Sequence, residues 1–375
     1  MKRFILLALL VSGCHASRQH ALAPRAEGPY RVLRSARVGG EGGTDYLYAD
    51  VVGRRLYIPR GGSRAVEATD STPARPATPG RITVFDLATL APIAEIPGTG
   101  GQGVAVDPVS GHGFSSSNPV SMFDSKTFTL VKTIDVGAAR PDGILFDPFN
   151  ERVYVFSHPT KDATVIDARD GHVLGTIDLG GVPEQAVTDG KGTLYVVMQD
   201  SAGSVTVVDA MTMKATAHYP LGGPGGCNGL ALDAANRVLF AACARSAPSP
   251  AGPSRPTMVV LSAMDGHILS TLPLAGGSDG AVFNPATREA FSSHSNGTLT
   301  VVAERSPTSF EVEQNLATMP GARTLTLDTQ TNRLFVMSVE RGPVPPSAVA
   351  SAQPGGRPPQ GPPIPGSFTI LMIGR

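Results

Sequence analysis

The chain has 375 residues with 31 basic and 31 acidic side chains, so its formal net charge is zero. This balance argues against a protein that holds nucleic acid through a basic surface. Aromatic residues make up only 6% of the chain, so aliphatic side chains must build most of the core, and the 43 glycines and 33 prolines indicate a fold with many turns.

Residues 1–13 have the composition of a secretory signal: two basic residues, a short apolar run and then small residues. The run is too short to span a bilayer, which takes about 20 residues. The sequence V-S-G-C, ending at Cys14, resembles the lipobox of bacterial lipoproteins, in which the cysteine becomes the lipid-modified N-terminus. We therefore expect a lipoprotein of the bacterial cell envelope, periplasmic or anchored in the outer membrane, that contacts a membrane only through this lipid. Cleavage after Ala16 without lipidation is one alternative and the absence of export is the other, and residues 14–29 would form a flexible tether.

Short apolar runs closed by turn residues follow one another through the rest of the chain. The clearest unit, residues 141–181, holds four runs rich in Val, Ile, Phe and Tyr, separated by Gly, Pro, Asp and Asn, as is typical of antiparallel strands. An acidic or amide residue closes the first run of every unit, at intervals of 40–57 residues: Asp50, Asp107, Asp147, Asp189, Asp233, Asn284 and Asp328. Four strands per unit and a period of about 40–50 residues predict a β-propeller, here with seven blades.

The last unit lacks a fourth strand, because the chain ends after the apolar run 367–373. Residues 30–38 have the pattern of a fourth strand without a blade of its own. We expect this segment to complete the last blade and close the ring, which removes the open sheet edges that favour aggregation. Residues 30–375 are therefore predicted to form one all-β, seven-bladed propeller of four-stranded antiparallel blades.

The third unit also suggests a family. Its segments R-V-Y-V-F-S (152–157), A-T-V-I-D (163–167) and G-T-I-D-L-G-G (175–181) resemble the YVTN-repeat (YncE-like) bacterial β-propellers, and the likeness extends over about residues 30–375. The resemblance implies the seven-bladed fold and says little about function. The chain has no tryptophan, so no blade carries a Trp-Asp signature, which argues against a WD-type propeller.

Three long insertions rich in Pro, Gly, Ala and Ser interrupt the repeat at residues 61–80, 244–256 and 341–366. Each falls between the second and third strands of a blade. These links lie at the same end of a propeller as the links between blades, so the insertions gather on one face. One interpretation is drift at tolerant loop tips. The other is a collar around a binding face, since loops on a rigid scaffold often carry function.

The innermost strands begin at this same end, beside the central channel, and each begins with a polar residue. The seven residues are Asp45, Gln102, Asp142, Glu184, Asn228, Asp279 and Arg323. Asp-Gly and Asn-Gly pairs at three of these positions are also ordinary turn chemistry, so the ring predicts either turn structure or a ligand site. His158 and His294 end second strands at the same face and are added as candidate ligands or bases.

We expect a binding scaffold that holds a protein or a small-molecule ligand on its loop-rich face without a cofactor. The alternative is a metal-dependent, lactonase-like hydrolase, because some propeller lactonases hold a divalent cation in a ring of carboxylates and amides. Asp142, Glu184, Asn228 and Asp279 offer the oxygen donors that Ca²⁺ prefers. Three or more of these oxygens within about 5 Å would favour the cation site, and carboxylates paired with Arg323 would favour the scaffold.

Cys227 and Cys243 are predicted to form a disulfide. The turn between the two strands that carry them centres on Ala235, which places the two cysteines directly opposite each other. Opposite residues in antiparallel strands have Cβ atoms about 4.5–5.5 Å apart, close to disulfide geometry, and an exported protein meets an oxidising compartment. Two buried free thiols are the alternative.

Overall fold

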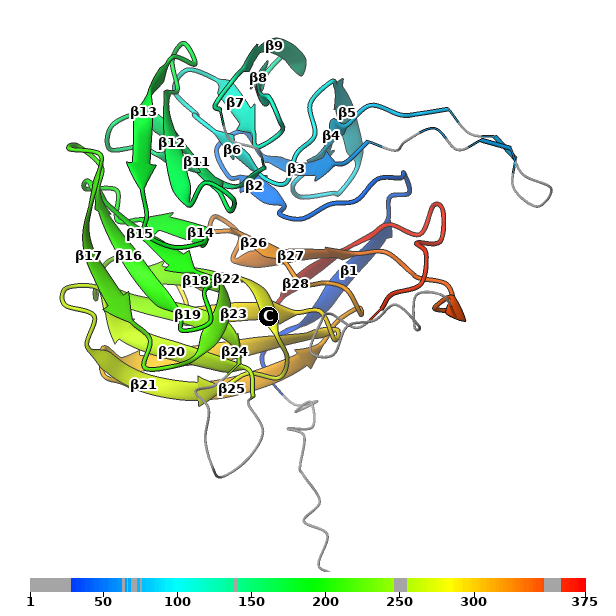
Figure 1. The fold of residues 1–375 in the computed structure, drawn as a ribbon. Helices are drawn as coiled ribbons and strands as arrows, with labels where there is room; N and C mark the ends of the chain where they lie inside the picture. The colour runs from blue at the N-terminus through cyan, green and yellow to red at the C-terminus, as the bar shows by residue number, and fades with distance from the viewer. Residues whose placement is uncertain are drawn as a thin grey trace, which may run out of the picture.

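The computed structural model describes residues 28–62, 65, 67–68, 73–74, 76–137, 140–245, 255–346 and 359–375. Its strands form seven four-stranded antiparallel sheets arranged as blades in a ring, so the predicted seven-bladed propeller is confirmed (Figure 1). The predicted signal 1–13, the lipidation site Cys14 and all of the tether except its last two residues lie outside the described residues. Among the described residues, no helix has the length and apolar character to cross a membrane.

The first four blades follow the chain order. Their strands are β2 (Tyr48–Asp50), β3 (Arg55–Arg60), β4 (Arg81–Asp86) and β5 (Pro92–Pro97); β6 (Val104–Val106), β7 (His112–Ser115), β8 (Val120–Asp124) and β9 (Thr129–Ile134); β10 (Pro141–Asp147), β11 (Arg152–Ser157), β12 (Asp162–Asp167) and β13 (Val173–Asp178); β14 (Pro183–Thr188), β15 (Thr193–Met198), β16 (Ser204–Asp209) and β17 (Lys214–Pro220).

The last three blades include the one that joins the two ends of the chain. Their strands are β18 (Gly225–Asp233), β19 (Val238–Arg245), β20 (Thr257–Ser262) and β21 (Ile268–Pro273); β22 (Ser278–Asn284), β23 (Glu289–His294), β24 (Thr298–Ser306) and β25 (Ser309–Ala317); β26 (Leu325–Asp328), β27 (Arg333–Ser338), β28 (Thr369–Gly374) and β1 (Arg31–Arg37).

The recurring acidic residue builds the turn between the first and second strands. Asp50 Oδ1 accepts a hydrogen bond from the Gly53 amide at 2.8 Å, and Asp233 Oδ1 accepts one from the Ala235 amide at 2.9 Å. A side chain that bonds the backbone two or three residues ahead stabilises such turns. The turn then passes through a left-handed residue, for example Arg54 with φ 57°. Local chemistry therefore sets the start of each second strand.

The middle strands of a blade are buried on both faces, whereas the outer strand is half exposed. In the fourth blade, β15 and β16 are almost wholly buried, and β17 alternates between exposed and half-buried residues. The reason is that neighbouring blades cover both faces of the middle strands, and the core is divided into clusters between adjacent blades.

The ring is closed as the sequence predicts. Strand β1 pairs antiparallel with β28, with Arg31 opposite Gly374 and Arg37 opposite Thr369. Tyr30, which precedes β1, is 2% exposed and belongs to the core cluster between the last two blades. The N-terminal strand therefore covers the edge that the seventh blade would otherwise expose.

The predicted disulfide is also confirmed. Cys227 lies opposite Cys243 in the pairing of β18 with β19, and their sulfur atoms are bonded. Both residues are fully buried in the core cluster between the fourth and fifth blades.

Candidate functional site

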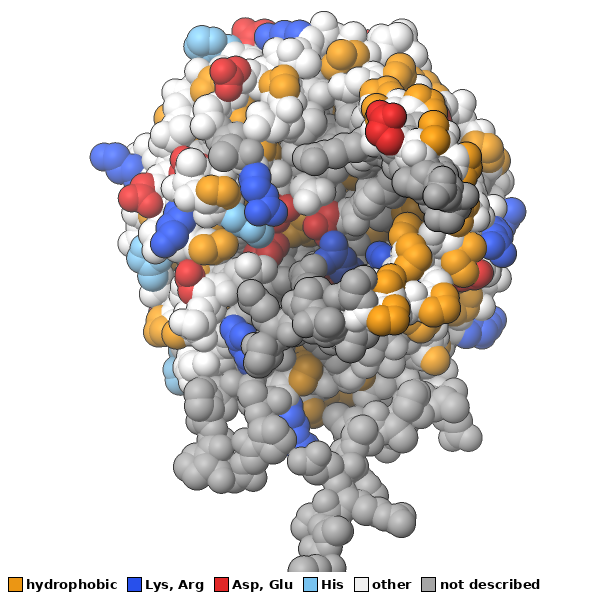
Figure 2. Space-filling model, turned by 45° about the vertical axis from the view of Figure 1, so that its right-hand side comes forward, with side chains coloured by type: hydrophobic (Ala, Val, Ile, Leu, Met, Phe, Trp, Pro, Cys, Tyr) orange, Lys and Arg blue, Asp and Glu red, His pale blue; other side chains and the backbone are white. Residues whose placement is uncertain are grey.

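A cavity of about 1290 Å³ opens at the end of the ring where the innermost strands begin. Figure 2 shows a hollow on one face of the molecule, with acidic and basic side chains inside it and hydrophobic side chains along one border. All three insertions contribute described residues to the lining of the cavity. They are Gly62, Ala244, Arg245, Arg341, Gln360, Pro362, Pro363, Ile364 and Pro365.

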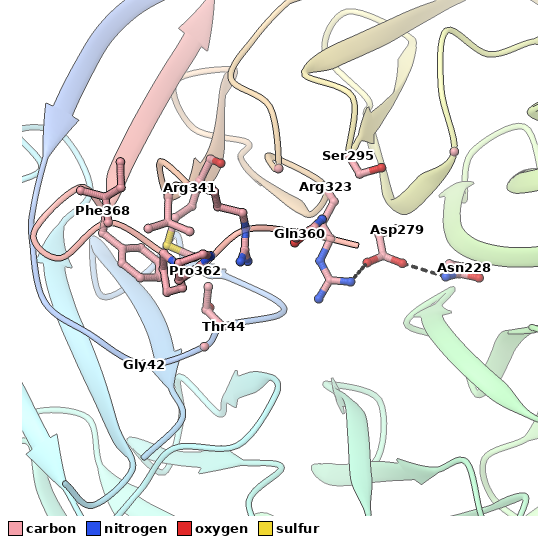
Figure 3. Close-up of a pocket in the computed structure, with 18 of the residues that line it drawn as sticks. Gly42, Thr44, Asn228, Asp279, Ser295, Arg323, Arg341, Gln360, Pro362 and Phe368 are labelled. Carbon is pink, nitrogen blue, oxygen red and sulfur yellow. Dashed lines mark hydrogen bonds and ion pairs between the residues drawn. The ribbon is translucent and has the colours of Figure 1, made fainter. Parts of the chain in front are cut away.

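The two sides of the cavity differ in chemistry. Pro362 and Phe368 form part of an apolar wall, and Asn228, Asp279 and Arg323 lie on the polar side (Figure 3). The apolar wall comes from the link between β27 and β28, and the polar side from the starts of the innermost strands. The fold thus places an insertion opposite the ring of polar residues.

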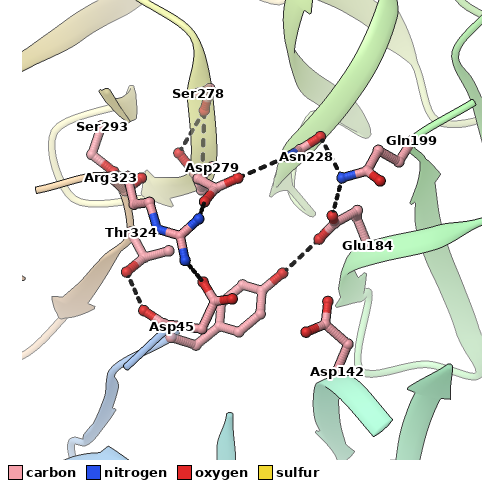
Figure 4. Close-up of polar contacts among 12 residues, drawn as sticks. Asp45, Asp142, Glu184, Gln199, Asn228, Ser278, Asp279, Ser293, Arg323 and Thr324 are labelled. Carbon is pink, nitrogen blue, oxygen red and sulfur yellow. Dashed lines mark hydrogen bonds and ion pairs between the residues drawn. The ribbon is translucent and has the colours of Figure 1, made fainter. Parts of the chain in front are cut away.

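One half of the polar ring is organised by Arg323, and we call it the arginine half. Its guanidinium pairs through Nη1 with Asp279 Oδ2 and through Nη2 with Asp45 Oδ1 at 3.1 Å (Figure 4). Asn228 Nδ2 donates to Asp279 Oδ1 at 2.7 Å. Burial lowers the pKa of Arg323, but the attraction of Asp279 and Asp45 outweighs it, so this pKa is raised. The carboxylates of the arginine half are therefore held by a permanent cation.

The other half of the ring, which we call the histidine half, gathers Asp142, His158 and Glu184. His158 Nε2 lies 2.9 Å from Asp142 Oδ2 and 3.6 Å from Glu184 Oε1. One ligand atom from each of the three residues lies within 4.8 Å of the other two. The pKa of His158 is raised, chiefly by its polar contact with Asp142, although burial opposes the shift. Asp142 lies in β10, Glu184 lies in β14, and His158 follows β11 directly.

Glu184 is the residue of the histidine half whose pKa is raised to about 8. Its Oε2 accepts a hydrogen bond from the Tyr46 hydroxyl at 2.9 Å, and its Oε1 accepts one from Gln199 Nε2. Burial and then the negative charge of Asp142 raise the pKa of Glu184 to about 8, against the opposing effect of His158. A carboxyl group with this pKa exchanges a proton near neutral pH, a property found at functional sites.

Gln199 joins the two halves into one network. It donates from Nε2 both to Glu184 Oε1 and, at 3.3 Å, to Asn228 Oδ1. The four oxygen-bearing residues that the sequence suggests for a cation therefore separate. Asp142 and Glu184 approach His158, whereas Asn228 and Asp279 are engaged in the arginine half.

Two of the nine candidate residues do not join the network of described contacts. His294 is fully buried within blade six, where its Nε2 lies 3.0 Å from Thr300 Oγ1, and burial lowers its pKa to about 3. Gln102 contributes a backbone carbonyl, which accepts a hydrogen bond from the Tyr46 amide at 2.9 Å. The remaining seven meet at the mouth of the channel.

The sequence reasoning missed Tyr46 and Gln199. Gln199 follows β15 directly, as His158 follows β11, so an alignment of the blades on their recurring acidic residue would have found it. Tyr46 follows Asp45 in the chain, but no repeat signal distinguishes it.

No protein-family model matches the chain, and no curated protein matches its sequence. Solved structures match its fold. A chain of the Kuenenia stuttgartiensis hydrazine synthase matches with a TM-score of 0.63 and 14% identity over 78% of this chain and 90% of that one. A chain of the mitotic checkpoint complex matches with a TM-score of 0.65 and 11% identity over 89% and 96%. The RRP9 WD40 repeats match with a TM-score of 0.65 and 10% identity over 92% and 99%.

At these identities the likeness concerns the fold alone. The protein is a seven-bladed β-propeller with WD40-like structural neighbours, although it has no tryptophan. The YVTN repeat remains a resemblance of sequence pattern.

Proposed function

We propose that this propeller is a binding scaffold that holds a segment of a partner protein in the cavity on its loop-rich face. The observation that carries the proposal is the size and two-sided lining of the cavity. Its volume of about 1290 Å³ exceeds the roughly 300–1,000 Å³ of small-molecule pockets, and a segment of polypeptide would use that space.

The lining favours a segment with an apolar side chain beside an acidic one. Ile364, 40% exposed, offers an apolar surface on which such a side chain would be buried. Arg245 and Arg341 are exposed at the rim and have no carboxylate partner among the described residues. Charge complementarity at a rim speeds association and selects partners.

The proposal includes export and lipid anchoring, which rest on the sequence of residues 1–14 alone. A protein with this leader would meet its partner in the bacterial cell envelope, attached to the membrane through Cys14 and without contact with nucleic acid. The scaffold needs no cofactor for this role.

The test is a selection of peptides from a random library against the immobilised full chain, followed by fluorescence-anisotropy titration of the enriched peptides. Ile364→Asp and Arg341→Glu should weaken binding at least about tenfold. Val109→Asp is the matched control, because Val109 is 79% exposed in the turn between β6 and β7, at the opposite end of the ring. Peptides that bind all three variants as they bind the wild type would overturn the proposal, and enrichment of no peptide would favour a small-molecule ligand.

Hydrolysis is the second candidate function, and the histidine half favours it. Glu184, with its pKa raised to about 8 by burial and by Asp142, is suited to move a proton to or from a water molecule. In the presence of the protein and added divalent metal, five- and six-membered lactones should open faster than in buffer. A pH indicator follows the reaction. Glu184→Gln should abolish the excess rate. A wild-type rate equal to that of buffer would exclude lactone hydrolysis.

A further inference from the structure

The histidine half has the composition and spacing of a three-ligand metal site. We propose that Asp142, His158 and Glu184 bind a divalent transition-metal ion of the zinc type through Oδ2, Nε2 and a carboxylate oxygen. This inference goes beyond the proposed scaffold function, because metal binding at the channel does not require a partner protein.

The distances suit a small ion. Zinc binds imidazole nitrogen and carboxylate oxygen at about 2.0–2.2 Å, so ligand atoms in a tetrahedral site lie about 3.3–3.6 Å apart. The observed separations from His158 Nε2 are 2.9 Å to Asp142 Oδ2 and 3.6 Å to Glu184 Oε1. Since the three ligand atoms already lie within 4.8 Å of one another, side-chain adjustments on the order of 1 Å would complete the geometry.

The ring nitrogen supplies a second observation. His158 Nε2 is buried and has no partner in hydrogen-bond geometry among the described residues, although it lies 2.9 Å from Asp142 Oδ2. In a hydrogen-bonded ion pair the N–H group would point along the line to the oxygen. The nitrogen therefore faces two carboxylates without a well-directed hydrogen bond to either of them. An ion between the nitrogen and the two carboxylates would contact all three groups.

Surrounding hydrogen bonds hold the Glu184 carboxylate and the backbone of Asp142 in place. The Tyr46 hydroxyl donates to Glu184 Oε2 at 2.9 Å and Gln199 donates to Glu184 Oε1, while Ser116 Oγ donates to the backbone carbonyl of Asp142 at 2.5 Å. Such outer contacts orient the ligands of protein metal sites and tune their affinity. The side chains of Asp142, His158 and Glu184 are 12%, 24% and 8% exposed, so the site is sheltered but reachable from the channel.

The donor set decides which ion is expected. Ca²⁺ takes six to eight oxygen ligands, but Asn228 and Asp279 are engaged with each other and with Arg323. One imidazole nitrogen with two carboxylates instead suits zinc and similar transition metals. A site with three protein ligands also leaves a fourth position for water or a ligand group.

The experiment uses the full chain, stripped of metal with a chelator and then titrated with Zn²⁺ by calorimetry. We expect one equivalent to bind with a dissociation constant of about 1 μM or lower. His158→Ala and Asp142→Asn should weaken binding at least about tenfold, and Tyr46→Phe should weaken it less, because it removes only an orienting contact. His172→Ala is the control, because this exposed histidine lies in the turn between β12 and β13, at the other end of the ring.

Cobalt absorption provides a second measurement, since Co²⁺ in the same site should show the spectrum of a four-coordinate complex that is lost in His158→Ala. The proposal is overturned if no Zn²⁺ binds at about 100 μM. It is also overturned if His158→Ala and Asp142→Asn bind Zn²⁺ as the wild type does. Calcium binding that does not depend on His158 would also overturn it. Loss of metal in the variants without loss of peptide binding would leave the scaffold function standing, so the two proposals fail separately.

Discussion

Tyr30 anchors the strand that closes the ring, and replacing it tests how much stability closure provides. Its ring is 2% exposed and packs edge-on against Phe291, with the ring centres 5.1 Å apart. Its hydroxyl donates to Glu289, and its backbone amide and carbonyl both bond the side chain of Gln314, each at 2.9 Å. One residue therefore connects the start of β1 to blade six.

Two substitutions separate the contributions. Tyr30→Ala removes a large buried ring, and such truncations cost about 3–5 kcal/mol. Losing the hydroxyl that faces Glu289 adds about 1 kcal/mol, so we expect the free energy of unfolding to fall by roughly 4–6 kcal/mol. Tyr30→Phe should cost only about 1–2 kcal/mol, because Glu289 keeps its ion pair with Arg375 at 2.6 Å.

The measurement is guanidinium unfolding of the full chain, monitored by circular dichroism. Tyr219→Ala on the outer strand β17 is the control, and it should cost less than Tyr30→Ala, because Tyr219 is only half-buried. Deleting residues 15–40 should cost more than either substitution, because it also bares the edge of β28. A Tyr30→Ala variant within about 1 kcal/mol of the wild type would show that the closing strand is not anchored in this way.

Three further predictions concern the cysteines and the buried histidine. Unfolded, unreduced protein should show no free thiol beyond Cys14, and two additional free thiols would contradict the disulfide. Replacing Cys227 and Cys243 by Ser should lower the free energy of unfolding by about 3 kcal/mol, because the bond closes a loop over a separation of 16 residues. Burial holds the pKa of His294 at about 3, so the unfolded state binds a proton that the folded state does not, and this residue's contribution to stability should fall by about 1.4 kcal/mol per pH unit as pH drops below about 6.5. The difference in unfolding free energy between the wild type and His294→Gln should therefore change by about 2 kcal/mol between pH 7 and pH 5, and the same pH dependence in both proteins would refute this assignment. Cys14→Ala should release the protein from the membrane fraction, because two acyl chains anchor stably, and unchanged association would refute lipidation.

The fold could be predicted because its information is local and repeated. The recurring acidic residue of each unit, such as Asp50 or Asp233, bonds the backbone of its own turn, so the turn forms wherever that residue occurs. The cysteine pairing followed from counting residues on either side of one such turn. The closing role of the N-terminal strand followed from the strand missing in the last unit.

The site depended on register and on distances across the channel. His294 and His158 both come at the ends of second strands, but His294 is the last residue of β23, opposite Ser278 of β22, while His158 comes one residue past the end of β11. Successive residues of a strand face opposite sides, so a shift of one position sends His294 into the blade and leaves His158 at the channel.

By itself, the sequence determined the seven blades, the closing strand, the disulfide and the face on which the polar residues gather. Only the tertiary structure decided which of those residues meet. Arg323 forms ion pairs with Asp45 and Asp279, while Asp142 and Glu184 contact His158. The physical reason is that turn chemistry and strand alternation act over a few neighbouring residues. Contacts between side chains of different blades depend instead on the diameter of the closed ring and the tilt of every blade in it.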